Sequence, residues 1–179
     1  IRVVNGVGEF YDRKTNKKFV PRGNNYIRLS QKVENDQTVL YHSTFDPGAY
    51  DHGRYALALS KMHQDGYNVV RVFLNHAALG APDGGLSQPY MGNVADFLEL
   101  YVIITQDWLP GGKYSEVLNK DCCTLFDASN LLHLSPAGAK AYRSFYTDFI
   151  NTLHTLNART DVIFSYELSN ELYFDNNLP

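Results

Sequence analysis

Residues 161–171 read Asp-Val-Ile-Phe-Ser-Tyr-Glu-Leu-Ser-Asn-Glu, an apolar strand that runs directly into an Asn-Glu pair. This order places an amide and a carboxyl side by side at the carboxyl end of a buried strand. Parallel α/β folds bind ligands and carry out chemistry at that end of their strands. Glu171 is therefore the leading candidate for a catalytic acid.

Toward the amino terminus, strand and helix patterns alternate. Strand patterns at 9–12 and 18–23 flank a polar turn at 13–16, which predicts a hairpin that leads, as a lid, into the first parallel strand. A loop rich in His, Asp and Gly is predicted over 41–53. The first β/α unit therefore begins within these residues.

The second unit follows the same order. Apolar residues at helical spacing predict a helix over 54–64, and Gly66 ends it in the left-handed conformation. The run 67–74 is short, β-branched and nearly continuous in apolar residues. This pattern is typical of a parallel strand that is buried on both faces.

The third unit contains an irregularity. A helix capped by Asn93 is predicted over 94–100, and a strand over 101–105. No turn residue separates Leu100 from Tyr101, whereas connections between a helix and a strand usually take about 2 to 6 residues. We therefore expect a short segment to be absent from the chain near 100–101.

The fourth unit is regular, because Ser135 caps a helix and Pro136 occupies its first position. The apolar stripe of this helix consists of Ala141, Phe145, Phe149, Leu153 and Leu156. Strands and helices that alternate in this way predict an α/β fold with a parallel sheet. No glycine-rich phosphate loop follows the first strand, so a (β/α)8 TIM barrel is favoured over a doubly wound sheet.

Chain length limits how much of a barrel is present. A complete barrel needs about 200 residues at least and about 250 typically, whereas this chain has 179. We therefore expect residues 1–179 to form the amino-terminal part of a single catalytic domain, with roughly the first four β/α units of the barrel.

Composition excludes several classes of partner. The chain is 44% hydrophobic and 20% charged, with a net charge of −3 and no run of Lys or Arg, which argues against nucleic acid and membrane partners. Its six His residues have no metal-ligand spacing, so we expect no metal site. Cys122 and Cys123 are adjacent, and buried thiols, pairing with other cysteines and a strained ring all stay open.

Four segments in this order resemble the first four strands of a clan A glycoside hydrolase, closest to family 5, which contains cellulases and mannanases. The segments are residues 19–25, 62–72, 101–104 and 166–171. The resemblance implies a secreted glycosidase that degrades β-linked poly- or oligosaccharide of the mannan or glucan type, with retention and without a cofactor. Its substrate, a carbohydrate, would be its partner.

The resemblance also implies residue roles. Glu171 would be the general acid/base, Asn170 would hydrogen-bond the 2-hydroxyl of the sugar, and Arg71 would support the nucleophile. The nucleophilic carboxylate, which retaining enzymes hold about 5 to 5.5 Å from the acid, is expected in the other half of the barrel. Glu167 lies roughly 13 Å back along the same strand, so we expect it to pair with Arg22 or Arg71 instead.

Further side chains near strand ends could either contact substrate or serve the structure, and both interpretations stay open. Trp108 would stack on a sugar or fill the core, while His76, Asn25 and Arg28 would contact substrate or serve the structure. Where the family commonly has His after its third strand, this chain has residues 106–108, Gln-Asp-Trp. This departure leaves the sugar specificity open, together with endo or exo action.

Two alternatives compete with a hydrolase. One is a non-catalytic carbohydrate-binding or inactive barrel relative, which lacks the second carboxylate. The other is a half-barrel that dimerises, because an open sheet exposes unpaired backbone groups at its edges. The oligomeric state stays open.

Overall fold

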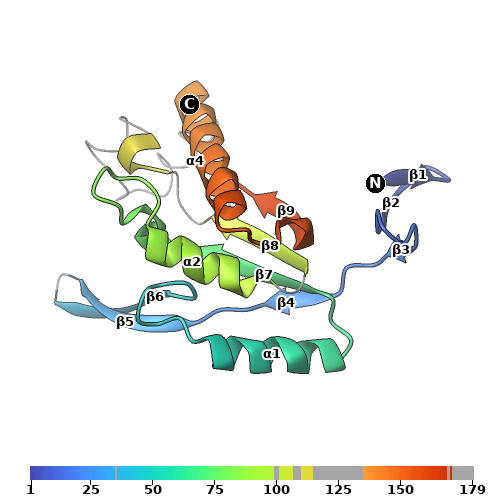
Figure 1. Ribbon diagram of the computed structural model, residues 1–179, viewed down its shortest axis with the longest axis horizontal. Coiled ribbons are helices and arrows are strands. Elements are labelled where there is room, and N and C mark those ends of the chain that lie inside the picture. Colours follow the sequence, from blue (N-terminus) through green and yellow to red (C-terminus); the bar gives the residue numbers. More distant parts are fainter. Residues whose placement is uncertain (35, 99–100, 107–109, 115–134, 169, 171–179) are drawn as a thin grey trace, which may run out of the picture.

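A computed structural model describes residues 1–34, 36–98, 101–106, 110–114, 135–168 and 170. Its centre is a four-stranded parallel sheet in the order β4-β7-β8-β9 (Figure 1). These strands are β4 (Gly23–Asn25), β7 (Val69–Leu74), β8 (Tyr101–Gln106) and β9 (Ile163–Glu167). The predicted parallel α/β sheet is therefore observed, whereas its closure into a barrel stays a prediction.

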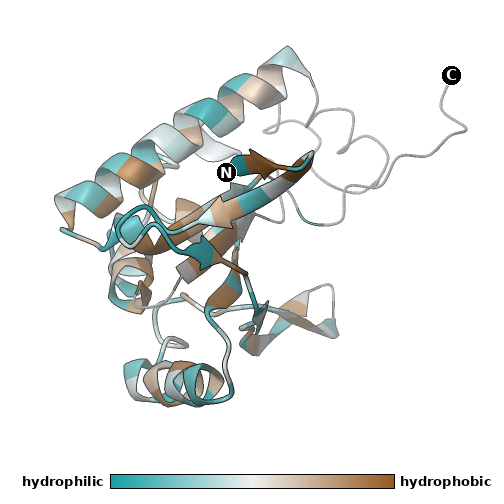
Figure 2. Cartoon of the chain, turned by 90° about the vertical axis from the view of Figure 1, so that its right-hand side faces the viewer, coloured by the Kyte–Doolittle hydropathy of each residue, from teal (hydrophilic) through white to brown (hydrophobic). Residues whose placement is uncertain are grey.

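The order of this sheet bears on the choice between the two α/β architectures. Each described strand of the sheet pairs with the one before it, so the order never reverses as it does in a doubly wound sheet. Helices α1 (His52–Gln64), α2 (Gln88–Phe97) and α4 (Pro136–Thr155) all lie on one face (Figures 1 and 2). One direction of winding with helices on one face is the arrangement that a barrel requires.

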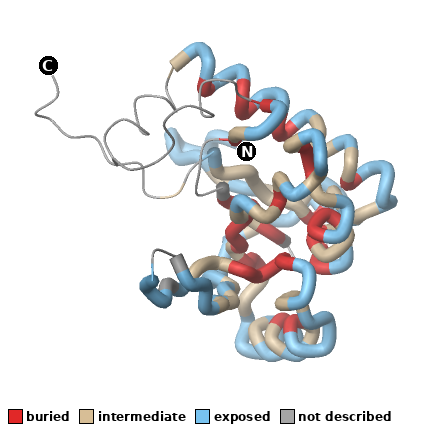
Figure 3. The backbone as a smooth tube through the Cα atoms, turned by 90° about the vertical axis from the view of Figure 1, so that its left-hand side faces the viewer, coloured by how far each residue is buried: buried red, intermediate tan, exposed pale blue. Residues whose placement is uncertain are grey.

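The hydrophobic core fills the space between this sheet and its helices, as the buried segments in Figure 3 show. Successive strand residues point to opposite faces. Val70, Val72 and Leu74 accordingly join the core, while Arg71 and Phe73 project from the face that the helices leave uncovered. That second face carries the polar side chains.

Local sequence explains where two of the helices begin and end. The side chain of Asp51 accepts a hydrogen bond from the N–H of Arg54 at the start of α1, and Gly66 follows its end at φ +88°. Ser135 Oγ accepts from the N–H of Gly138 at 3.0 Å, as predicted for α4. The predicted stripe of α4 is buried except for Leu156, which is its C-cap and is 38% exposed.

The prediction for α2 was wrong. The helix begins after Ser87, with Pro89 in its first turn, and ends at Phe97. Asn93 therefore lies inside the helix, where its Nδ2 donates to the backbone oxygen of Phe45 at 2.9 Å. The expected missing segment near 100–101 falls partly on residues outside those that the structure describes.

The amino-terminal strands form a separate antiparallel sheet. It contains β1 (Arg2–Val4), β2 (Val7–Tyr11) and β3 (Lys18–Phe19), so the predicted hairpin is present. Phe10 and Phe19 contact Phe164 with ring centroids 5.0 and 5.6 Å apart. The hairpin therefore lies at the amino ends of the parallel strands, the end opposite to the candidate site.

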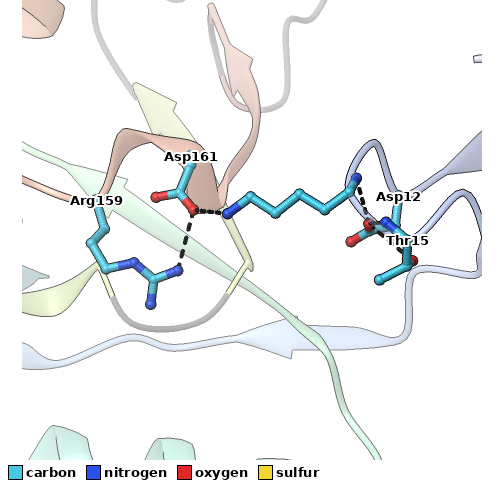
Figure 4. A network of polar contacts seen from close by, with 5 residues as sticks. Asp12, Thr15, Arg159 and Asp161 are labelled. Atoms are coloured by element: carbon cyan, nitrogen blue, oxygen red, sulfur yellow. Dashed lines mark hydrogen bonds and ion pairs between the residues drawn. The ribbon is translucent and has the colours of Figure 1, made fainter.

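Lys14 and Asp161 add an ion pair between this hairpin and the segment before β9. Lys14 Nζ lies 3.2 Å from the Asp161 carboxylate, which also accepts from Arg159 at 3.2 Å (Figure 4). Asp12 accepts from the backbone N–H groups of Lys14 and Thr15, which fixes the turn that presents the lysine. The short helix η4 (Thr160–Val162) carries the aspartate.

A second hairpin was not predicted. Strands β5 (Leu29–Glu34) and β6 (Gln37–His42) pair in antiparallel register after β4, so this hairpin rises at the carboxyl end of the sheet. Asp36 takes φ +60° at its turn. The predicted loop 41–53 is therefore shorter than expected, because its first residues belong to β6.

Gly23 permits the pairing of β4 with β7. A Cβ at this position would lie 2.4 Å from the backbone oxygen of Val69, so no larger residue fits without a backbone shift.

No helix in the described part of the chain has the length and apolarity to span a membrane.

Candidate functional site

An ion pair between Arg71 and Glu167 forms the centre of the candidate site. Arg71 lies on β7 and Glu167 ends β9, on either side of β8. Arg71 Nε donates to Glu167 Oε2 at 2.7 Å, and Nη2 lies 2.5 Å from the same oxygen. Of the two partners that the sequence offered for Glu167, the structure selects Arg71 over Arg22.

Glu167 is held from both faces of the sheet. Thr105, which is fully buried on β8 opposite Glu167, donates from Oγ1 to Glu167 Oε2 at 2.7 Å. On the helical side, the hydroxyl of Tyr146 in α4 donates to the backbone oxygen of Glu167 at 2.9 Å. These contacts fix the carboxylate and the main chain at the point where β9 ends.

The electrostatics of Glu167 follow from these contacts. Partial burial alone would raise the pKa of Glu167, but the hydrogen bonds from Arg71 and Thr105 outweigh it and lower that pKa below its ordinary value. The carboxylate is therefore ionised at neutral pH. The donors Arg71 Nε, Arg71 Nη2 and Thr105 Oγ1 all meet Oε2.

Asn170 joins the same cluster. Arg71 Nη2 donates to Asn170 Oδ1 at 2.8 Å, so one guanidinium binds both the end of β9 and the residue three positions beyond it. Two of the three residues to which the resemblance assigns roles, Arg71 and Asn170, are thus in direct contact. Glu171, the predicted acid, lies outside the described residues.

Two aromatic rings in a tilted arrangement lie beside the ion pair. Arg71 Cζ is 4.4 Å from the ring centroid of Phe73, and the ring of His42 lies 4.6 Å from the same ring. Phe73 is buried and His42 is half-buried, so His42 is the ring of the two that a sugar could contact. Neither His42 nor Phe73 was predicted for the site, because His42 fell within the predicted loop 41–53 and Phe73 within a strand predicted to be buried on both faces.

A buried carboxylate, Asp46, lies in the loop that follows β6, and it shares a donor with the last residue of that strand, His42. Asn75 Nδ2 donates to Asp46 Oδ1 at 2.6 Å and also to the backbone oxygen of His42. Asp46 is 8% exposed, and burial raises its pKa although hydrogen bonds from Asn75 and Tyr41 oppose the shift. The first β/α loop and the end of β7 are therefore tied together at the carboxyl end of the sheet.

Two other predicted residues lie nearby. Asn25 pairs in register with Arg71, and both line a hollow of about 370 Å³ on the uncovered face of the sheet together with Ile103. His76 begins the short helix η1 (His76–Leu79), where it is exposed. Asn25 therefore shares a surface with Arg71, while His76 lies just beyond the strand.

Some predictions fall on residues that the structure does not describe. These are Trp108 as a stacking platform, the state of Cys122 and Cys123, and Glu171 as the acid. Across the described ranges, no group of three or more His, Cys, Asp or Glu side chains is arranged to hold a metal ion.

Comparisons with family models, with curated proteins and with solved structures found no match.

Proposed function

We propose that this chain belongs to a retaining β-glycosidase in which Glu171 is the general acid/base. The observation that carries the proposal is the contact of Arg71 with both Glu167 and Asn170 at the carboxyl end of a singly wound parallel sheet. Glu171 follows Asn170 directly in the chain, so the peptide bond keeps the proposed acid next to an anchored amide.

The proposed mechanism needs two carboxyl groups. Glu171 protonates the glycosidic oxygen as the bond to the anomeric carbon breaks, while a second carboxylate attacks that carbon and forms a glycosyl-enzyme. Glu171 then takes a proton from a water molecule whose oxygen attacks the anomeric carbon and displaces the second carboxylate, so the sugar is released with its configuration retained. Asn170 donates to the sugar 2-hydroxyl, and its Oδ1 is oriented by Arg71.

Glu167 does not serve as the second carboxylate in this proposal. Its Oε2 accepts from Arg71 and Thr105. The pKa of Glu167 is lowered because Arg71 balances the negative charge of the carboxylate. We place the nucleophile in a later strand of the barrel, which would lie opposite the uncovered face of the described sheet. Arg71 contributes a positive charge to the face on which that carboxylate would lie.

The test is Glu171→Gln in the full-length protein, with hydrolysis of mannan and of mixed β-glucan as the readout. We expect the turnover to fall about 10²- to 10⁴-fold, because the amide cannot donate the proton. Glu9→Gln is the matched control, since Glu9 pairs with Lys18 at the opposite end of the sheet. A Glu171→Gln turnover equal to that of the control rules out the acid role.

A non-catalytic carbohydrate-binding protein is the second candidate, and one observation favours it. The two carboxylates described near the carboxyl end of β7 and β9, Glu167 and Asp46, are both engaged in hydrogen bonds within the protein. This candidate predicts that oligosaccharide binds without being cleaved and that Glu171→Gln leaves the affinity unchanged.

The dimerising half-barrel stays a third candidate, since β4 and β9 are the outer strands of the described parallel sheet. It predicts a stable dimer of this chain in light scattering, while a monomer would count against it.

A further inference from the structure

A second hollow, separate from the candidate site, lies between the base of the β5–β6 hairpin and the first turn of α1. Its volume is about 280 Å³. It is lined by Tyr26, Ile27, Arg28, Leu29, Arg54 and Ala58. None of these residues lines the hollow beside Arg71.

Arg28, which lines this hollow, has one guanidinium nitrogen, Nη1, that is buried and has no hydrogen-bond partner among the described residues. Its main chain is fixed, because the N–H donates to Thr44 Oγ1 at 3.2 Å and the carbonyl accepts from the N–H of Ser43 at 2.9 Å. A buried charged donor without an acceptor is costly, so an acceptor at this position would be stabilising.

Arg54 supplies a second guanidinium to the same hollow. It lies in the first turn of α1, where its backbone N–H donates to Asp51 Oδ1 at 3.0 Å. Among the described residues that line the hollow there is no carboxylate, and Asp51, the nearby acid, is already used as the cap of the helix. Two like charges that share one hollow repel each other unless an anion lies between them.

We propose that Arg28 and Arg54 bind an oxyanion, that is, a carboxylate, sulfate or phosphate group. Guanidinium groups suit this chemistry because their planar donors match two oxygens at once. Tyr26 lies at the wall of the hollow, where the charges of Arg28, Arg54 and Asp51 all act on its hydroxyl. The net charge of the chain is −3, so this pair of cations is a local feature and not a result of composition.

The oxyanion could come from an inorganic ion or from an acidic sugar, and one titration separates these sources. The full chain is titrated by calorimetry, at constant ionic strength, with sodium sulfate, with methyl β-glucuronide and with neutral methyl β-glucoside. We expect saturable binding of sulfate and of glucuronide, and none of the glucoside. Tighter binding of glucuronide than of sulfate identifies an acidic sugar, whereas equal binding identifies the anionic group alone.

Variants connect this binding to the two arginines. We expect Arg28→Gln and Arg54→Gln each to weaken sulfate and glucuronide binding at least about tenfold, as loss of a charge-assisted hydrogen bond implies. Arg143→Gln, at an exposed position of α4, is the matched control and should bind as the wild type does. Arg54 is also exposed, so its variant should fold even if the Arg28 variant does not.

The proposal is overturned if the wild type shows no saturable binding of either anion, or if Arg54→Gln binds as tightly as Arg143→Gln. Neither result bears on the proposed glycosidase, because Glu171 and Arg71 take no part in this test.

Discussion

The two ends of the parallel sheet are held in different ways. At the amino end, the hairpin is attached by the rings of Phe10 and Phe19 on Phe164, and its ion pair is exposed, with 81% of the Lys14 and 46% of the Asp161 side chain accessible. At the carboxyl end, the corresponding values for Arg71 and Glu167 are 23% and 34%.

The contacts at the amino end attach the hairpin to the sheet, whereas those at the carboxyl end orient side chains. Exposed ion pairs contribute about 0 to 1 kcal/mol, so the aromatic contacts must provide most of the attachment at the amino end. At the carboxyl end, charged groups lose part of their hydration. Hydrogen bonds of defined geometry within the protein must offset that cost in free energy. Such an arrangement stabilises one geometry of Arg71, Glu167 and Asn170, as a binding or catalytic site requires.

The largest effect is expected from Arg71→Ala. The substitution leaves Glu167 with Thr105 as its described donor and removes the hydrogen bond that Arg71 donates to Asn170 Oδ1. We expect the free energy of unfolding to fall by about 2 to 3 kcal/mol, measured by urea denaturation at neutral pH. Arg143→Ala, at an exposed site, should cost less than about 0.5 kcal/mol. Equal losses for the two variants would contradict a distinct role for the carboxyl end.

Phe164→Ala tests the aromatic attachment at the amino end. Fully buried Phe→Ala changes cost about 3 to 5 kcal/mol, and the partial burial of Phe164 reduces the expected loss to about 1 to 2 kcal/mol. Because Phe164 contacts both Phe10 and Phe19, amide hydrogen exchange in β2 and β3 should also accelerate. Unchanged exchange in the hairpin would show that other contacts hold it.

The pH dependence distinguishes Glu167 from Asp46. Glu167 has a lowered pKa, so its stabilising contribution is present above its ordinary value of 4.5 and is lost as the pH falls through the folded-state pKa. Asp46 has a raised pKa, so its contribution is present below its ordinary value of 3.8 and is lost as the pH rises through the folded-state pKa.

Urea denaturation at several values between about pH 3 and pH 7 measures these contributions. The stability advantage of the wild type over Glu167→Gln should shrink toward acid pH, whereas its advantage over Asp46→Asn should grow. Parallel curves for the two variants would contradict the opposite shifts.

The smallest effect is expected from Asp161→Asn. The exposed contacts of Asp161 with Lys14 and Arg159 should contribute less than about 1 kcal/mol, and about 1 M salt should remove most of that contribution. A loss comparable to that of Phe164→Ala would mean that charge, and not packing, attaches the hairpin.

The sequence predicted those parts of the fold that local patterns specify. The apolar run of β7, the Ser135 cap of α4 and the strand before Asn170 each carry their signal within a few residues. The partner of Glu167 was predicted as either Arg22 or Arg71, because a carboxylate inside a sheet requires a cation, and the structure shows Arg71.

Other parts escaped prediction for two reasons. The β5–β6 hairpin had a weak signal, since Leu29 and Val33 are two of the few apolar residues in a polar stretch that precedes the sequence Asn-Asp. Ser87 and Pro89 likewise marked the start of α2. The contact of Asn75 with Asp46 had no local signal. Such pairs follow from the spatial placement of two loops, and no pattern within either segment specifies them.

The pairing order of the sheet also determines how the chain can assemble as it is synthesised. Each parallel strand binds the strand made just before it, so the sheet can grow in step with translation. The amino-terminal hairpin is the exception, because Lys14 and Asp161 are 147 positions apart. The hairpin is made before the strands of the parallel sheet, so it must wait for η4 and β9 before it docks, and this contact closes a long loop.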